Sequence, residues 1–159
     1  MLGRNRIVRR KRNGEFELHL SEDERDLLRS LTGQLRQLLE RDAVQDPSLK
    51  RLFPVAYTDR PDLDDEYQRL MHDDLLGHRL GSIATVEETI GLERLTEDQL
   101  LGWMGALNDL RLVLGTRLDV SEETEVVDPD PDDPNAAALA VYGWLGWLLE
   151  HVVDALNPA

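Results

Sequence analysis

The sequence NAAALAVYGWLGWLLEHVVDALN (residues 135–157) decides the fold. Apolar side chains fill most of its positions, so a helix over this range is apolar nearly all round. Asp133 and Pro134 stand where an N-cap and a first helical residue are favoured. Because such a helix is stable only when it is covered, we expect a buried C-terminal helix within a bundle. A homodimer would bury any apolar surface that the bundle cannot cover.

Residues 21–120 carry the signals of a helical body. Ser21 with Glu24, and Thr96 with Gln99, are capping boxes, in which a hydroxyl and a carboxylate or amide satisfy the first amides of a helix. Leucines recur at helical spacing after each box. The expected helices cover residues 21–41, 62–90 and 96–118, with an irregular, packed connection over 47–61. The fold class is therefore mainly α, a bundle of four or five helices with an N-terminal β-hairpin.

Close helix packing is predicted where glycines recur. Gly102 and Gly105 lie in the third expected helix, and Gly143 and Gly146 lie in the last. Each glycine lowers helix propensity by about 1 kcal/mol relative to alanine, so a close approach between helices must offset that cost.

The hairpin is predicted over residues 4–20. Asn13-Gly14 stands between two extended runs, and this dipeptide is a strong hairpin signal because both residues of a two-residue turn take positive φ. Pairing outward from that turn sets Arg10 against Glu17 on an ionic face and places Ile7 on an apolar face. The apolar face must dock on the helices, since an isolated hairpin is marginally stable in water.

Charge is distributed unevenly along the chain. The first twelve residues contain six basic residues and no acid, whereas the formal net charge of the chain is -14. Residues 121–134 contain three prolines among many acids, which predicts an acidic loop. A basic hairpin on an acidic body indicates contacts with macromolecules.

Length and composition limit the class of protein. The 159 residues suit a single domain over 1–159. The chain has no cysteine, which excludes disulfides, thiolate metal sites and a catalytic thiol. No uninterrupted apolar run approaches the roughly 20 residues of a membrane-spanning helix, so we expect a cytoplasmic protein without membrane contact.

The basic residues of the hairpin are the candidate partner-binding site; they are Arg6, Arg9, Arg10, Lys11 and Arg12. The alternatives are a solvated strand pair balanced by acids, contact with an acidic protein, and contact with nucleic acid. Aromatic residues for base stacking are missing apart from Phe16, and the acidic body repels DNA. Contact with a protein is therefore favoured over direct DNA binding.

A polar cluster interrupts the apolar stripe of the third helix at Asn108, Asp109 and Arg111. If that helix is central, these side chains are partly buried and must pair, because an unpaired buried charge is costly. The first interpretation is a structural polar network, and the alternative is a ligand-binding cluster. The tryptophans, which are Trp103, Trp144 and Trp147, are expected in the core, with an aromatic binding surface as the alternative.

No catalytic, cofactor or metal site is predicted. Asp74 and His78 are four residues apart and could share one helical face, but two ligands do not make a metal site. The histidines have no nucleophile in a recognisable setting, and no phosphate loop or dinucleotide fingerprint is present. We therefore expect a protein that is not an enzyme.

Five segments carry a family resemblance: RIVRR (6–10), RLFPVAY (51–57), HDDLL (72–76), ALNDLRLVLGTRL (106–118) and VYGWLGWL (141–148). The chain resembles an actinobacterial family first catalogued as a domain of unknown function and later labelled the oxidative-stress transcription regulator AosR. The resemblance implies a cytoplasmic regulator that acts through a sigma factor or RNA polymerase, often encoded beside the protease adaptor ClpS. It also implies a redox switch that uses a cysteine pair, which a chain without cysteine cannot form.

The sequence therefore predicts a non-enzymatic helical regulatory module that binds other proteins. Two rival hypotheses remain. One is a small-ligand sensor whose pocket lies between the third and last helices, near Asn108, Asp109, Arg111 and Trp144. The other is an accessory protein of ClpS-linked proteolysis.

Overall fold

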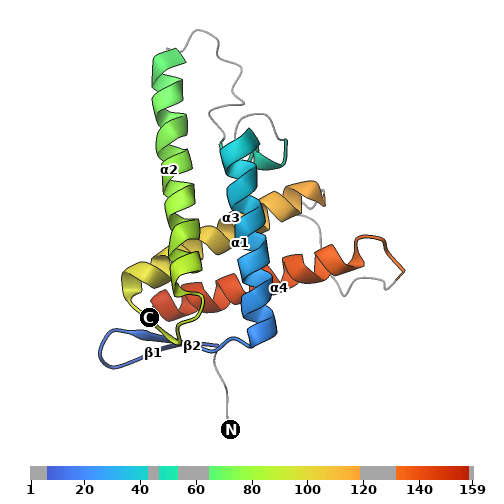
Figure 1. The fold of residues 1–159 in the computed structure, drawn as a ribbon. Coiled ribbons are helices and arrows are strands. Elements are labelled where there is room, and N and C mark those ends of the chain that lie inside the picture. Colours follow the sequence, from blue (N-terminus) through green and yellow to red (C-terminus); the bar gives the residue numbers. More distant parts are fainter. Residues whose placement is uncertain (1–6, 43–46, 54–64, 119–131, 158–159) are drawn as a thin grey trace.

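The computed structural model describes residues 7–42, 47–53, 65–118 and 132–157, and their elements give a mainly α fold (Figure 1). The elements in chain order are β1 (Val8–Arg10), β2 (Phe16–Leu18), α1 (Glu22–Asp42), the short 3₁₀ helix η1 (Pro47–Leu49), α2 (Asp65–Thr89), β3 (Arg94–Leu95), α3 (Glu97–Arg117) and α4 (Ala136–Leu156). The expected helical bundle with an N-terminal hairpin is confirmed.

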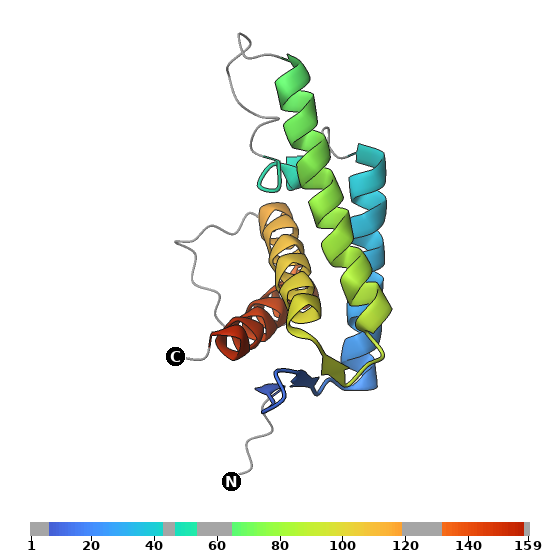
Figure 2. The same cartoon turned by 90° about the vertical axis from the view of Figure 1, so that its left-hand side faces the viewer.

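The helices form two layers with the small sheet at one end. α1 and α2 run antiparallel in one layer, and α3 and α4 cross them in the other (Figures 1 and 2). The strands lie in the order β1-β2-β3, and both pairs are antiparallel. β3 was not expected, because its two residues are too short to show an alternating pattern.

Both predicted capping boxes form. The Ser21 hydroxyl accepts from the amide of Glu24 at 3.1 Å, and the Glu24 carboxylate accepts from the amide of Ser21 at 2.9 Å. Thr96 and Gln99 form the same reciprocal pair at the start of α3. These bonds fix the first turns of the helices that follow β2 and β3.

Glycines bring α3 close to α2, as predicted. A Cβ at Gly102 would lie 2.8 Å from the Cγ2 atom of Thr85, and one at Gly105 would lie 2.9 Å from the hydroxyl of Ser82. In α4 the expectation fails at Gly143, where a Cβ would meet no atom within 4 Å.

The hairpin register differs by one residue from the predicted one. Val8 pairs with Leu18, and Arg9, in place of Arg10, pairs with Glu17. The amide of Lys11 donates to the carbonyl of Glu15 at 2.8 Å, so the loop has three residues, and Gly14 takes φ 86°. A three-residue loop needs one left-handed residue at its end, and it moves β1 along β2 relative to the two-residue turn.

Burial of α4 is confined to one side, which corrects the expectation of a helix covered nearly all round. Leu145, Leu148 and Val152 are fully buried, but Trp147 and Val153 are 41% and 39% exposed. The N-cap of α4 is Asn135, not the predicted Asp133, and the Asn135 side chain makes no capping hydrogen bond. The Asp133 carboxylate accepts from the amide of Asn135 at 2.8 Å.

Candidate functional site

The exposed face of the sheet gathers the basic side chains. Arg9, Glu17 and Arg94 are neighbours across the three strands, so their side chains share one face. Lys11, two residues from Arg9, joins that face and contacts the Glu17 carboxylate at 2.8 Å. Arg12 is exposed in the adjoining turn. We call this surface, made of Arg9, Lys11, Arg12 and Arg94 around Glu17, the basic sheet face.

Glu17 is the acid at the centre of the basic sheet face. Hydrogen bonds from Lys11 and His19, together with the charges of Lys11 and Arg9, lower the pKa of Glu17 from 4.5 to about 2. Glu17 therefore stays ionised at neutral pH and orders Lys11. Arg9, Arg12 and Arg94 remain exposed on this face and in the adjoining turn.

Two of the five predicted partner-binding residues have structural roles. Arg10 lies on the inner face of the sheet, with its guanidinium 4.9 Å from the centre of the Phe16 ring. It donates to the carbonyls of Ala155 and Leu156 at 3.3 Å each, and so caps the C-terminal end of α4. Lys11 is held by Glu17. Arg6 lies outside the described residues, and Arg94 is a basic residue that the sequence argument missed.

The predicted polar cluster divides into separate contacts. Asp109 is fully buried, and its carboxylate accepts from Arg79 of α2 at 2.9 Å. Arg111 donates to the Tyr142 hydroxyl at 3.4 Å. Asn108 is partly buried and, among the described residues, bonds to neither. The predicted pairing of Asp109 is therefore present, but its partner comes from another helix.

Burial dominates the electrostatics of Asp109. It raises the pKa of this carboxyl from 3.8 to about 7, and the nearby Arg79 opposes the rise. Within the described part of the chain, the Oδ2 atom of Asp109, the Nε atom of Arg79 and the Nδ1 atom of His72 are buried without a hydrogen-bond partner. The carboxyl is thus a titratable group inside the bundle, held by one cation.

Arg25 of α1 is a buried cation that the sequence argument did not single out. Its guanidinium donates to the carbonyls of Leu18, Leu20, Ile90 and Leu92, and so joins the sheet, α1 and the end of α2. Trp144 adds a second link, because its Nε1 atom donates to the Glu24 carboxylate at 3.1 Å. The Arg25 contacts fix the sheet against the helices, and the Trp144 contact links α4 to α1.

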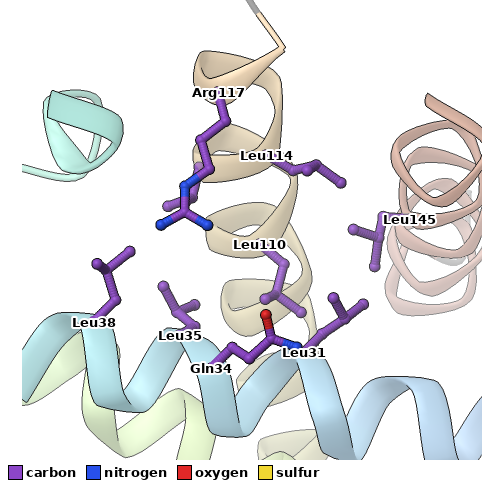
Figure 3. Close-up of a pocket in the computed structure, with 9 residues that line it drawn as sticks. Leu31, Gln34, Leu35, Leu38, Leu110, Leu114, Arg117 and Leu145 are labelled. Atoms are coloured by element: carbon purple, nitrogen blue, oxygen red, sulfur yellow. The ribbon is translucent and has the colours of Figure 1, made fainter. Parts of the chain in front are cut away.

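A small apolar cavity lies between α1, α3 and α4 (Figure 3). Its volume is about 90 Å³, and leucines from all three helices line it, with Gln34 and Arg117 as the polar residues. The sequence predicted a ligand pocket near Asn108, Asp109, Arg111 and Trp144, none of which lines this cavity. Its size suits one apolar side chain or a similarly small molecule.

The tryptophans occupy three different environments. Trp103 is fully buried and donates to the Thr89 hydroxyl at 2.7 Å, as expected for a core residue. Trp144 is partly buried, and Trp147 is exposed, with its ring 4.5 Å from that of His151. The expectation of three core tryptophans is therefore wrong for Trp147.

The helix α4 is long and apolar enough to cross a membrane. The core helix of a soluble protein can have the same length and composition.

Comparison with known proteins identifies the family to which the chain belongs. The model of the family described as "Domain of unknown function (DUF2017)" matches residues 5–156. The chain is 33% identical to the putative oxidative stress regulator AosR of Mycobacterium leprae, over 70% of this chain and 59% of that protein. It is 34% identical to the oxidative stress regulator AosR of Mycobacterium tuberculosis, over 70% of this chain and 58% of that protein. The chain thus covers less than two thirds of these relatives, and no solved structure matches it significantly.

Proposed function

The chain belongs to the DUF2017 family, and from this membership we propose that it is a cytoplasmic regulatory protein without enzymatic activity that acts through protein contacts. Relatives named oxidative stress regulators support a regulatory role at the level of the family. The chain has no cysteine, so the proposed role includes no thiol switch.

The observation that carries this proposal is the basic sheet face. Arg9, Arg12 and Arg94 are exposed on a chain with a formal net charge of -14. Residues outside the first twelve carry a net charge of 12 - 32 = -20, because six of the 18 basic residues and none of the 32 acids lie in that segment. An acidic protein surface would be attracted to the face, whereas the body would repel a nucleic acid.

The proposed partner is a sigma factor or another RNA polymerase subunit. The family resemblance supplies this class of partner, and the basic sheet face supplies the chemistry of contact. The partner would bring carboxylates to the three arginines, whose planar guanidinium groups bind carboxylates through two parallel hydrogen bonds. Contact of this kind is sensitive to salt.

The test compares two triple variants in capture of purified polymerase and sigma factors from the organism of origin. Arg9→Gln, Arg12→Gln and Arg94→Gln together remove the exposed arginines. Arg41→Gln, Lys50→Gln and Arg69→Gln remove three exposed charges from other parts of the surface and serve as the matched control. Arg10 is left intact because it caps α4.

We expect the first variant to lose capture by at least about tenfold in Kd, which is 1.4 kcal/mol, while its helical circular dichroism is unchanged. The control should bind like the wild type, and added salt should weaken wild-type capture. Equal binding by both variants would rule out the basic sheet face as the contact. Purified ClpS is tested in the same way, and its capture in place of polymerase subunits would favour the accessory role in proteolysis.

A small-ligand sensor is a second candidate, and the apolar cavity favours it. A cavity of about 90 Å³ lined mainly by leucines suits a small apolar molecule. At least one member of a panel of short-chain aliphatic and small aromatic compounds should raise the melting temperature of the wild type and not that of Leu114→Trp, which fills the cavity. A panel that leaves the wild type unchanged would contradict this role.

A further inference from the structure

An open groove lies between α2 and α3, and it shares no residue with the apolar cavity or the basic sheet face. Its volume is about 680 Å³, within the range of roughly 300–1,000 Å³ that is usual for small-molecule sites. Glycines of both helices line it, together with the apolar side chains of Leu101 and Met104 and the carboxylate of Asp98.

The glycines of α2 in this groove have no role in helix packing. Gly102 of α3 is needed there, because a Cβ would collide with Thr85. A Cβ at Gly77 or Gly81 would meet no atom within 4 Å, yet each glycine lowers helix propensity by about 1 kcal/mol relative to alanine. Packing within the chain does not offset that cost at these two positions. Their effect is to keep the groove open as far as the backbone of α2.

Ser82 provides an unpaired hydroxyl in the groove. The residue is 8% exposed, and its side chain makes no hydrogen bond within the described part of the chain. The hydroxyls of Thr85 and Thr89 on the same helix donate to the carbonyls four residues earlier, at 3.1 and 2.6 Å. The Ser82 hydroxyl instead lies beside Gly105, 2.9 Å from the place of a Cβ there. A nearly buried hydroxyl without a partner is costly, so it indicates that the groove receives a polar group from outside the chain.

Asp98 determines the charge of the groove. It is exposed in the first turn of α3 and makes no ion pair with any described residue. None of the described residues that line the groove is Lys or Arg, and Arg94, four residues before Asp98, is paired across the strands with Glu17. Because the chain also has a net charge of -14, the groove attracts a cation and repels an anion.

The order of groups along the groove suits an extended ligand. The Ser82 hydroxyl lies beside Gly105, and Asp98 is seven residues before Gly105, which is about 10 Å along α3. Leu101, which is 43% exposed, and Met104 lie between these ends. A matching ligand has an ammonium group at one end, methylene groups in the middle and a second hydrogen-bond donor at the other end. A linear aliphatic amine has this order, and it is thin enough to lie against glycine backbone.

We propose that the groove between α2 and α3 binds a linear aliphatic polyamine, with one ammonium group against Asp98 and another amine group donating to the Ser82 hydroxyl. The methylene chain packs on Leu101 and Met104, and Gly81 leaves room for it. Binding supplies the hydrogen bond that Ser82 lacks in the free chain. The site shares no residue with the basic sheet face, so it stands or falls separately from the proposed function.

Isothermal titration calorimetry of the whole chain with spermidine at moderate salt tests the proposal. We expect one saturable site in the wild type, and Asp98→Asn should raise its Kd by at least about tenfold. Glu97→Gln removes the same charge from the neighbouring position, which does not line the groove, and should bind like the wild type. Equal binding by these two variants would mean that spermidine binds diffusely to the acidic surface, and would overturn the proposal. The absence of a saturable site in the wild type would overturn it too.

Two further variants test the shape of the groove. Gly81→Leu should melt at a higher temperature and lose spermidine binding, because leucine favours the helix more than glycine and fills the groove. Gly143→Leu, at an exposed and open glycine of α4, is the matched control and should keep binding. Ser82→Ala should weaken binding without lowering the melting temperature, since the hydroxyl has no partner in the free chain. Undiminished binding by Gly81→Leu, or displacement of spermidine by an equal concentration of magnesium, would contradict the proposal.

Discussion

At the scale of single residues, Asp109 and Arg25 show two ways of keeping a charge inside the bundle. Asp109 has one cation, Arg79, and an oxygen without a partner among the described residues. Arg25 has four carbonyl acceptors, so its donors are satisfied by neutral groups. Burial raises the pKa of Asp109 to about 7, so the charge of this carboxyl is sensitive to pH near neutrality.

Asp109→Asn should change the pH dependence of stability. The folded pKa of Asp109 is about 7 against an ordinary 3.8, so between these values the folded chain binds a proton that the unfolded chain has released. The unfolding free energy of the wild type therefore falls as pH rises through this window, by up to about 4 kcal/mol. Asparagine does not titrate, so the unfolding free energy of the variant does not fall in this way. The difference between the two unfolding free energies, variant minus wild type, should therefore rise between pH 4 and pH 8.

Urea unfolding of both proteins at several pH values measures that difference. Taking the difference cancels the effect of Glu17, whose lowered pKa has the opposite sign and removes stability as pH falls from about 4.5 to about 2. A difference that does not vary with pH would show that Asp109 titrates alike in the folded and unfolded chain. Partner capture unaffected by the substitution would favour a structural role for the cluster.

At the scale of elements, the packing of α3 on α2 depends on Gly102. A Cβ there would lie 2.8 Å from Thr85 Cγ2, closer than side chains tolerate, so Gly102→Ala should lower the unfolding free energy by about 1–3 kcal/mol despite better helix propensity. Thr85→Ala removes the opposing atom and should restore part of the loss in the double variant. Gly77→Ala, at an open position of α2, should be neutral or stabilising. Additive effects of Gly102→Ala and Thr85→Ala would mean that these residues do not limit the approach of the helices.

The elements also show what sequence can predict. Local signals determined both capping boxes and the helices that follow them, because Ser21 with Glu24 and Thr96 with Gln99 act within one turn. The hairpin was correctly placed, but Asn13-Gly14 fits both a two-residue and a three-residue loop. The Asn13 side chain bonds the amide of Glu15 at 3.0 Å and supports the longer loop. The longer loop shifts the register by one residue from the predicted one, and Val8 lies in the core.

Contacts between distant parts of the chain could not be inferred in the same way. Asp109 clearly needed a partner, but Arg79 lies 30 residues away, and periodicity does not show which basic residue faces it. The basic run suggested a single binding surface, yet Arg10 is used to cap α4, 145 residues further along the chain. Composition also overstated the burial of α4. An apolar helix signals that it needs cover, but composition does not tell whether its own bundle or another molecule supplies that cover.

At the scale of the whole molecule, charge should govern stability and binding with opposite responses to salt. The net charge of -14 makes the folded chain repel itself, and salt screens this repulsion over a Debye length of about 10 Å at 0.1 M. The melting temperature should therefore rise by about 2–4 °C per kcal/mol of repulsion removed as sodium chloride is added. Surface pairs such as Lys11–Glu17 weaken under the same conditions, but a single pair of this kind contributes little to stability.

Binding through the basic sheet face should weaken over the same range of salt, because it depends on attraction between exposed charges. Parallel measurements of melting temperature and partner capture at increasing sodium chloride check both responses. The Arg9, Arg12 and Arg94 triple variant should show the stability response, slightly enlarged because its net charge is more negative, together with weak binding at every salt concentration. A melting temperature that falls as salt is added would mean that attractive surface pairs outweigh self-repulsion. The acidic body would then stabilise the fold through local ion pairs, and the charge asymmetry would no longer point to a partner.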